Sequence, residues 1–287
     1  MGKTTLILIL TFFCIVSSQA ASLLDINPDG RSAAMGDATV SMSEGAIAMW
    51  NNPAGLANGT YGSAAFGSHK WIGDVTGTHI AGALRWKEWG VGVTVRSAGS
   101  ENLEARQSPS LEPQGTFGVR ESDFGFGLAR EFNDKLKIGA SSTYRYNRIE
   151  DDVATEWKYG LGAQYKITAA LKSGLSLLYS NGGNGKQEGS VVPHAGMGYS
   201  HDLPAGTVVT GAVDLRAEEH KARGGIGAEL TILHMLSLRG GYQFGYDSQG
   251  MSYGVGASWK NLKINLGVVP FSNDLGTTTR ISVEFGV

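Results

Sequence analysis

The sequence predicts an all-β fold, a 14-stranded antiparallel transmembrane β-barrel with a short N-terminal hatch in or below the lumen. Three observations predict it: apolar residues alternate with glycine or polar residues, short and long connections alternate, and no segment after residue 20 approaches about 18 consecutive apolar residues. The chain has 287 residues, 42 glycines and a net charge of −2. This composition excludes a disordered chain and a protein that binds nucleic acid.

Residues 1–20 are expected to form a cleaved secretory signal peptide. Lys3 is followed by an apolar run that ends near Val16, and residues 18–20 have the small-x-small pattern of a cleavage site. The single cysteine, Cys14, lies in this peptide, so no disulfide or cysteine metal site is expected in the exported chain. Residues 21–59 are then expected to form the hatch, and residues 60–287 the barrel.

The period-two alternation is clear in residues 89–96, WGVGVTVR. One face carries a tryptophan and three valines, and the other carries two glycines, Thr94 and Arg96. Fourteen such segments lie near 60–70, 76–86, 89–97, 116–130, 135–147, 156–167, 171–180, 190–201, 207–216, 221–232, 236–245, 251–260, 262–269 and 277–287. The core strands of a soluble β-sandwich also alternate, but a sandwich does not need fourteen strands with a polar second face. The apolar faces are therefore expected to meet lipid.

The connections between these segments alternate in length. Most of those on one side span two to five residues, whereas 98–115, 148–155, 181–189 and 270–276 are longer. Outer-membrane barrels have short periplasmic turns and longer extracellular loops. We interpret the acidic stretch 148–155 as an extracellular loop, with calcium binding through Glu150, Asp151 and Asp152 as the alternative.

The predicted inward face is rich in cations. Together with lysines, it holds fourteen cations against five anions, and the candidate lumen cations are Arg85, Arg96, Arg145, Arg216, Arg223, Arg239 and Arg280. Such an excess would attract anions, including carboxylates. The alternative is that these charges pair with one another and with a plug. Inward glycines at i, i+2, such as Gly225 and Gly227, favour close approach of another segment of the chain.

The sequence offers little for catalysis. The six histidines lie on different segments, without an HExxH motif or metal-ligand spacing on one strand. Nothing singles out a serine, a histidine and an acid as a hydrolase site. The chain is therefore expected not to be an enzyme and to use no metal and no cofactor.

Residues 46–59, AIAMWNNPAGLANG, interrupt the alternation. Ser43 is expected to cap a short helix over 44–50, and Asn52 to cap a second turn with Pro53 at its first position. Asn58 and Gly59 are expected to close that turn. Because irregular backbone in lipid would leave polar groups unsatisfied, the segment must lie inside or below the barrel.

Both ends of the mature chain carry a family resemblance. GRSAAMGDATVSMSEGAIAMWNNPAGLA resembles the opening of the PorV/PorQ-type outer-membrane proteins, a group related to the long-chain fatty-acid transporter FadL. LSLRGGYQ and GMSYGVGASWKNLKINLGVVPFSNDLGTTTRISVEF resemble the end of the same group. The resemblance implies a 14-stranded barrel with an N-terminal hatch. Its hatch-motif residues here are Gly30, Met35, Gly36, Trp50, Asn52, Pro53, Ala54, Gly55 and Leu56.

The resemblance implies two functions in the outer membrane of a Gram-negative bacterium. PorV-like members serve type IX secretion and receive exported cargo, so secretion-system components, exported proteins and outer-membrane lipid are the expected partners. The alternative is a FadL-like channel for fatty acids or other hydrophobic small molecules. The short chain leaves little room for the long extracellular loops of FadL, and we therefore expect a secretion-accessory role.

Overall fold

The computed structural model describes residues 22–105, 113–182, 189–218 and 221–287, so the expected signal peptide lies outside the described residues. Short helical elements come first: α2 (Gly30–Ala34), η1 (Gly45–Ile47), α3 (Ala48–Asn51) and η2 (Pro53–Ala57). The strands follow: β1 (Gly62–Lys70), β2 (Thr76–Trp86), β3 (Trp89–Ala105), β4 (Gly115–Glu131), β5 (Leu136–Ile149), β6 (Asp152–Lys166), β7 (Leu171–Ser180), β8 (Ser190–Leu203), β9 (Thr207–Glu218), β10 (Lys221–Ile232), β11 (Leu236–Phe244), β12 (Met251–Trp259), β13 (Leu262–Pro270) and β14 (Thr277–Gly286). No described helix has the length and apolar character needed to span a membrane.

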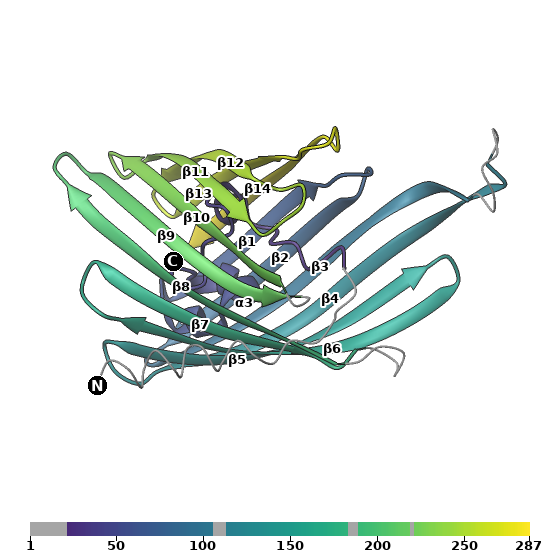
Figure 1. Ribbon diagram of the computed structural model, residues 1–287. Helices are drawn as coiled ribbons and strands as arrows, with labels where there is room; N and C mark the ends of the chain where they lie inside the picture. Colours follow the sequence, from purple (N-terminus) through teal and green to yellow (C-terminus); the bar gives the residue numbers. More distant parts are fainter. Residues whose placement is uncertain (1–21, 106–112, 183–188, 219–220) are drawn as a thin grey trace.

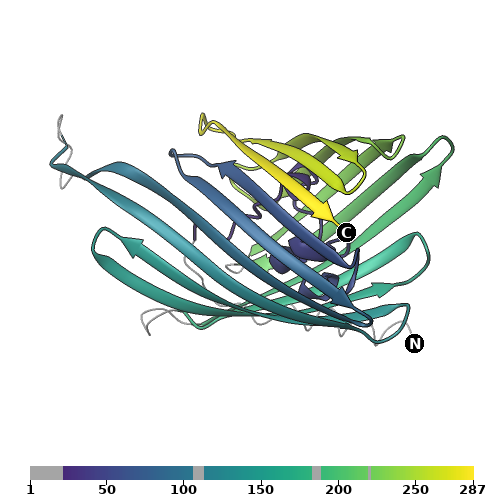
Figure 2. The same ribbon diagram turned by 180° about the vertical axis from the view of Figure 1, so that it is seen from behind.

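The strands close into one barrel. Each strand pairs in antiparallel fashion with its neighbours in the chain, and β1 pairs with both β2 and β14. Phe66 in β1, for example, faces Ile80 on one side and Val283 on the other. Figures 1 and 2 show the N-terminal hatch enclosed by this wall, near the end that carries the C-terminus. The predicted 14-stranded barrel with an N-terminal hatch is confirmed, and each predicted segment overlaps one strand.

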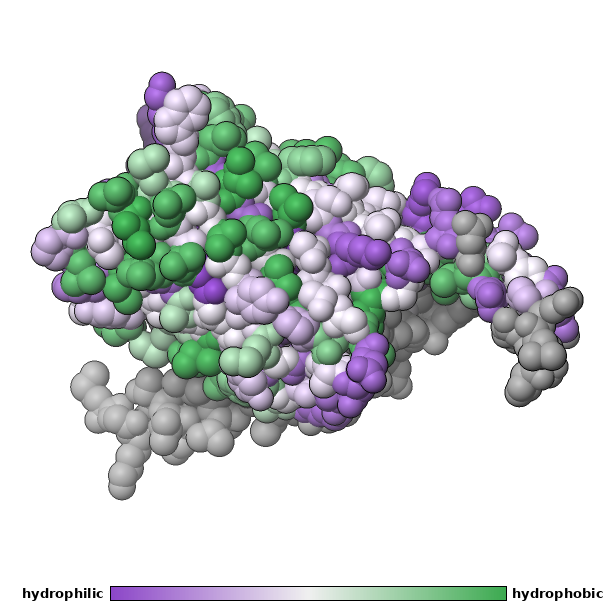
Figure 3. Space-filling view, turned by 90° about the horizontal axis from the view of Figure 1, so that it is seen from above, coloured by the Kyte–Doolittle hydropathy of each residue, from purple (hydrophilic) through white to green (hydrophobic). Residues whose placement is uncertain are grey.

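The two faces of the wall differ in polarity. In β3, Val91, Val93 and Val95 are exposed outward, whereas Gly92 and Thr94 are buried inward. Figure 3 shows hydrophobic side chains gathered over the strands that lie uppermost in Figure 1. Charged and polar groups such as Asp123 and Arg280 are buried inside. This inversion of the usual soluble pattern is the arrangement of a transmembrane barrel.

Two hairpins extend further than the sequence predicts. β3 and β4 reach residues 105 and 115, beyond the predicted limits of 97 and 116. The predicted acidic loop at 148–155 is wrong, because β5 ends at Ile149, β6 begins at Asp152, and Glu150 turns the chain with φ 56°. Polar residues continue these strands past the apolar belt, so a search for apolar alternation ends each strand too early.

The hatch helices agree with the sequence only in part. Asn52 caps η2 by accepting a hydrogen bond from the Ala54 backbone at 3.1 Å, with Pro53 at the first position as expected. The single helix over 44–50 capped by Ser43 is wrong: Gly45, with φ 58°, begins a 3-10 turn that passes into α3. The helix α2, capped by the Asp29 carboxylate, was not predicted, because five residues are too few for a periodic pattern.

Inward glycines lie where the hatch touches the wall. A Cβ on Gly139 would lie 2.4 Å from the Pro53 carbonyl carbon, and one on Gly225 would lie 1.8 Å from the Gly36 oxygen. On the outward face, the nearest atom to a Cβ on Gly82 would be 3.9 Å away. The inward glycines therefore let two backbones approach more closely than any side chain permits.

We expect Gly139→Val to destabilise the protein, although valine ordinarily favours a strand. Its side chain would overlap the hatch at Pro53, and overpacking of this kind costs about 1–3 kcal/mol. The measurement is the urea midpoint of the heat-modifiable folded band in detergent. Gly82→Val is the control and should leave the midpoint unchanged or raise it; equal midpoints for the two variants would contradict the close packing of the hatch.

Candidate functional site

The lumen and its hatch form the candidate site. The helix α2 packs against β12, β13 and β14, and η2 packs against β3, β4, β5 and β6, so the two elements reach opposite parts of the wall. Between them, Ile47, Met49 and Leu56 form an apolar cluster with small alanines of β1, β2 and β4, such as Ala81 and Ala129. The hatch is therefore joined to the wall by apolar packing as well as by polar contacts.

A buried charge cluster fixes the first residues of the hatch. Asp25 accepts hydrogen bonds from Lys158 Nζ at 2.7 Å and from Arg145 Nη1 at 3.0 Å. Arg145 also donates to Asp123 at 2.7 and 3.0 Å, and Asp123 contacts Arg96. Burial alone would raise the pKa of the Asp25 carboxyl, but the positive charges of Lys158 and Arg145 outweigh it and hold the pKa well below its usual range. Asp25 therefore stays ionised at neutral and mildly acidic pH, and this contact would be lost only in strong acid.

Two further ion-pair groups hold α2 and the turn after it. Glu229 on β10 accepts two hydrogen bonds of 3.0 Å from Arg31 of the hatch and contacts Arg239 on β11. Asp37 accepts from Gln243 at 2.7 Å and pairs with Arg280 at 3.4 Å. The hatch thus supplies a cation to an anion of the wall in one ion pair and an anion to a cation of the wall in the other.

The other candidate lumen cations also have acidic partners. Arg85 pairs with Glu131 at 2.6 Å, near the end of the barrel. Arg223 and Arg216 pair with Glu218 at 2.9 and 3.6 Å, and both lie against the ring of Tyr246. All seven candidate arginines therefore have a carboxylate within 4 Å. The count of five anions omitted hatch acids such as Asp25 and Asp37, which fold into the lumen.

Backbone groups of the hatch are bound by buried polar side chains of the wall. Asp214 Oδ2 accepts from the backbone N–H groups of Thr39 and Val40 at 2.7 and 2.8 Å. Asn52 is fully buried, and its Nδ2 lies within hydrogen-bond distance of the carbonyl oxygens of Val40 (2.9 Å), Ala163 (3.1 Å) and Leu175 (3.2 Å). Asn52 therefore links the cap of η2, another part of the hatch, and two strands of the wall.

The structure places the remaining hatch-motif residues at close contacts. Gly36 has φ 65° and lies against β10 and β11, where a Cβ would come within about 3 Å of Ile226 and Tyr242 backbone atoms. Trp50 Nε1 donates to Thr94 Oγ1 at 2.9 Å. Gly55 folds onto the Ser43 carbonyl. Gly30, Met35, Pro53, Ala54 and Leu56 are all buried between the hatch and the wall.

A cavity of about 420 Å³ remains in the lumen beside the hatch. Its lining is mixed: apolar groups of both hatch and wall stand beside the paired cations described above. The apolar residues are Leu23, Leu24, Ile26, Met49, Trp50, Pro53, Trp71, Leu178 and Val192. Of these, only Trp50 and Pro53 were predicted as site residues, and the stretch SLLDIN before the glycine-rich motif carries no recognised pattern.

The structure does not support the alternative prediction that the stretch 148–155 binds calcium. Within the described ranges, no group of three or more histidine, cysteine or acidic side chains is placed to hold a metal ion. Glu150, Asp151 and Asp152 are exposed on a tight turn, where Asp151 pairs with Arg148 at 3.8 Å.

No protein-family model matches the sequence, and no curated protein matches it either. Solved structures, however, share its fold. The CymD monoaromatic hydrocarbon channel superposes with a TM-score of 0.65 at 13% identity, over 93% of this chain and 99% of that chain. The Pseudomonas putida toluene transporter TodX gives 0.64 at 14% identity, over 92% and 98% of the two chains.

A Pseudomonas aeruginosa FadL homologue gives a TM-score of 0.58 at 10% identity, over 90% of this chain and 98% of that chain. The chain thus spans nearly the full length of these barrels. The FadL-like side of the sequence resemblance has structural support, whereas the PorV/PorQ side stays a prediction. The protein has the fold of the FadL-type outer-membrane transporters.

Proposed function

We propose that this protein is a non-enzymatic channel for small hydrophobic molecules in the outer membrane of a Gram-negative bacterium, exported with a cleaved signal peptide. The observation that carries the proposal is the set of apolar side chains that line the lumen cavity beside the paired charges, although the cavity lies inside a polar barrel. Leu178 and Val192 face each other across β7 and β8, and Leu24 and Ile26 of the hatch line the same space. A water-filled pore for polar solutes would not need these groups.

The two ends of the cavity differ. Trp71 and Tyr246 follow β1 and β11, at the end of the barrel away from the C-terminus, and both line it. On the other side lie Met49 and Pro53 of the hatch. A molecule that enters past Trp71 and Tyr246 would therefore meet the hatch, and passage further would require part of the hatch to shift.

The fold comparisons favour the same function. The barrels of similar fold include a monoaromatic hydrocarbon channel and a toluene transporter, at identities too low to transfer a substrate. A hydrophobic small molecule is thus the proposed partner. The secretion-accessory role, with secretion components or exported proteins as partners, draws no support from the lumen or from these comparisons.

The proposal is tested by filling the cavity. Cells that express the protein should take up an apolar fluorescent dye such as N-phenyl-1-naphthylamine faster than cells without it. Val192→Trp places an indole in the lumen and should return the initial rate to background. Val191→Trp is the matched control, because Val191 faces outward opposite Tyr179, and it should keep the wild-type rate. Equal uptake by the two variants at equal folded amounts would contradict the proposal.

We expect Asn52→Ala to change permeability without abolishing barrel assembly. The substitution removes the side chain that caps η2 and contacts carbonyl groups of the hatch and of two strands, whereas the fourteen strand pairings stay intact. Loss of these buried contacts costs about 1–3 kcal/mol, which raises the open fraction of the hatch roughly fivefold or more. The open probability in single-channel recordings from planar bilayers measures this fraction.

Asn58→Ala is the control on the same segment, since Asn58 takes part through its backbone in the bonds to Gly45 and Gly55. It should conduct like the wild type. Loss of the heat-modifiable folded band in Asn52→Ala would show instead that Asn52 is needed for assembly, and an unchanged conductance would show that it does not hold the hatch.

A further inference from the structure

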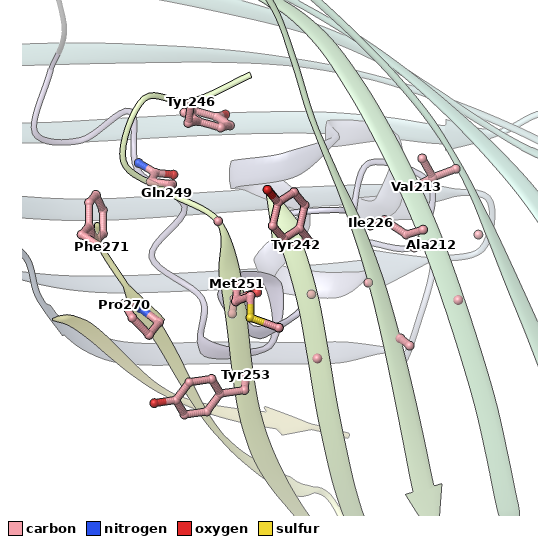
Figure 4. A pocket seen from close by; sticks show the side chains of 18 of the residues that line it. Ala212, Val213, Ile226, Tyr242, Tyr246, Gln249, Met251, Tyr253, Pro270 and Phe271 are labelled. Atoms are coloured by element: carbon pink, nitrogen blue, oxygen red, sulfur yellow. The ribbon is translucent and has the colours of Figure 1, made fainter. Parts of the chain in front are cut away.

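A large groove lies on the outer surface of the barrel, apart from the lumen cavity. It has a volume of about 1400 Å³ and crosses β8 to β12. Figure 4 shows Val213, Ile226, Tyr242, Met251 and Tyr253 along it, on four neighbouring strands. The groove therefore lies within the apolar belt that faces lipid.

The floor of the groove is one row of cross-strand neighbours. Tyr199 faces Gly211, Gly211 faces Ala228, Ala228 faces Gly240, and Gly240 faces Tyr253. A Cβ on Gly240 would meet no atom within 4 Å, and one on Gly211 would meet its nearest atom at 4.0 Å. The row is therefore an open channel across three strands, with a tyrosine at each end.

Large side chains form the two sides of this channel. On each strand, the residues two positions before and two positions after the floor residue form the sides. One side carries Val213, Ile226, Tyr242 and Met251, and the other carries Val209, Leu230, Leu238 and Val255. Strands rise about 3.3 Å per residue, so the Cα rows of the two sides are roughly 13 Å apart before their side chains narrow the gap. An α-helix, about 10–12 Å wide with its side chains, does not fit, but a single hydrocarbon chain does.

The wall beneath the groove is supported from inside. Gly225, Gly227 and Gly241 face the lumen, and Cβ atoms on them would lie within about 2.5 Å of backbone atoms of Met35 and Gly36. The hatch therefore supports this part of the wall from the lumen side and keeps the floor of the groove from moving inward. The groove is a fixed feature of the surface.

The surroundings identify the occupant. The groove is continuous with the lipid-facing belt, and a second barrel, whose outer wall is convex, would touch its sides without filling the floor. From Tyr199 to Tyr253 it spans four strand spacings, roughly 19 Å. Beyond the side of the groove that Met251 forms lie Ser248, Gln249 and Ser272, which offer polar groups to an ester or a headgroup. We propose that the groove holds one acyl chain of a membrane phospholipid, as a site independent of transport through the lumen.

The test is photolabelling of the full chain in phosphatidylcholine vesicles that contain phosphatidylcholine with a diazirine in one acyl chain. Labelled residues are identified by mass spectrometry. Label on Tyr242 and Tyr253 should exceed that on Tyr159 and Tyr179, outward tyrosines of β6 and β7 with similar exposure, by roughly threefold or more, since a held chain stays near its contacts longer.

Gly240→Leu fills the floor and should reduce the groove label to the level of Tyr159. Gly82→Leu adds the same side chain to the outer face of β2 and should leave the groove label unchanged. If Gly240→Leu loses the heat-modifiable folded band, Gly211→Leu is used instead, because Gly211 lies in the same floor row, on β9.

Equal label on all four tyrosines in the wild type would overturn the proposal, as would a groove label that both filled variants retain. Label on Tyr242 and Tyr253 below that on Tyr159 would show that protein covers the groove, as a second copy would, and would also overturn it. Dye uptake is measured in parallel, so that failure of the transport function is seen separately.

Discussion

The structure depends on direct packing of the hatch backbone against the bare backbone of the wall. Gly36 can lie on β10 because Gly225 has no side chain, and Pro53 can lie on β5 because Gly139 has none. These contacts also fix the strand register, since a slip of one residue would turn the outward valines and aromatics into the lumen. One constraint thus explains the inward glycines beneath the hatch and the position of the hatch.

Charge pairing follows from this packing. The hatch brings Asp25 and Asp37 to Arg145, Lys158 and Arg280, which are almost fully buried. Removing one partner from a buried ion pair typically costs about 3–5 kcal/mol, so complete expulsion of the hatch would leave several costly charges. A local shift of the segment that borders the cavity leaves most pairs in place. The account therefore favours gating by part of the hatch.

The fold was largely readable from the sequence because each strand obeys the same period, as in Trp89 to Arg96. Strand ends were less readable, because polar residues 148–155 continue a hairpin beyond the apolar belt. The sequence indicated the hatch residues and the lumen arginines of the site, but not which of them contact one another. Asp25 and Arg145 are 120 positions apart, and nothing in the sequence indicates that they meet, so the net positive charge of the lumen was overestimated. Ser43 looked like a helix cap, yet the positive φ of Gly45 sets the start of the helix. The resemblance favoured secretion, whereas the apolar side chains in the lumen cavity and the shared fold favour the proposed transport.

Under the proposed function, hydrophobic molecules pass only when the hatch shifts within the lumen. The mature chain is expected to be free of cysteine, so a reversible tether can be introduced with Met49→Cys and Gly92→Cys. Met49 borders the cavity, and a Cβ at position 92 would lie 3.2 Å from Met49 Cγ, close enough for a disulfide. The measurement is the initial rate of apolar dye uptake by cells expressing this variant, oxidised and then reduced with dithiothreitol, beside each single-cysteine variant. We expect uptake near background when the variant is oxidised and recovery of uptake on reduction. Unchanged uptake with the disulfide fully formed would contradict this expectation.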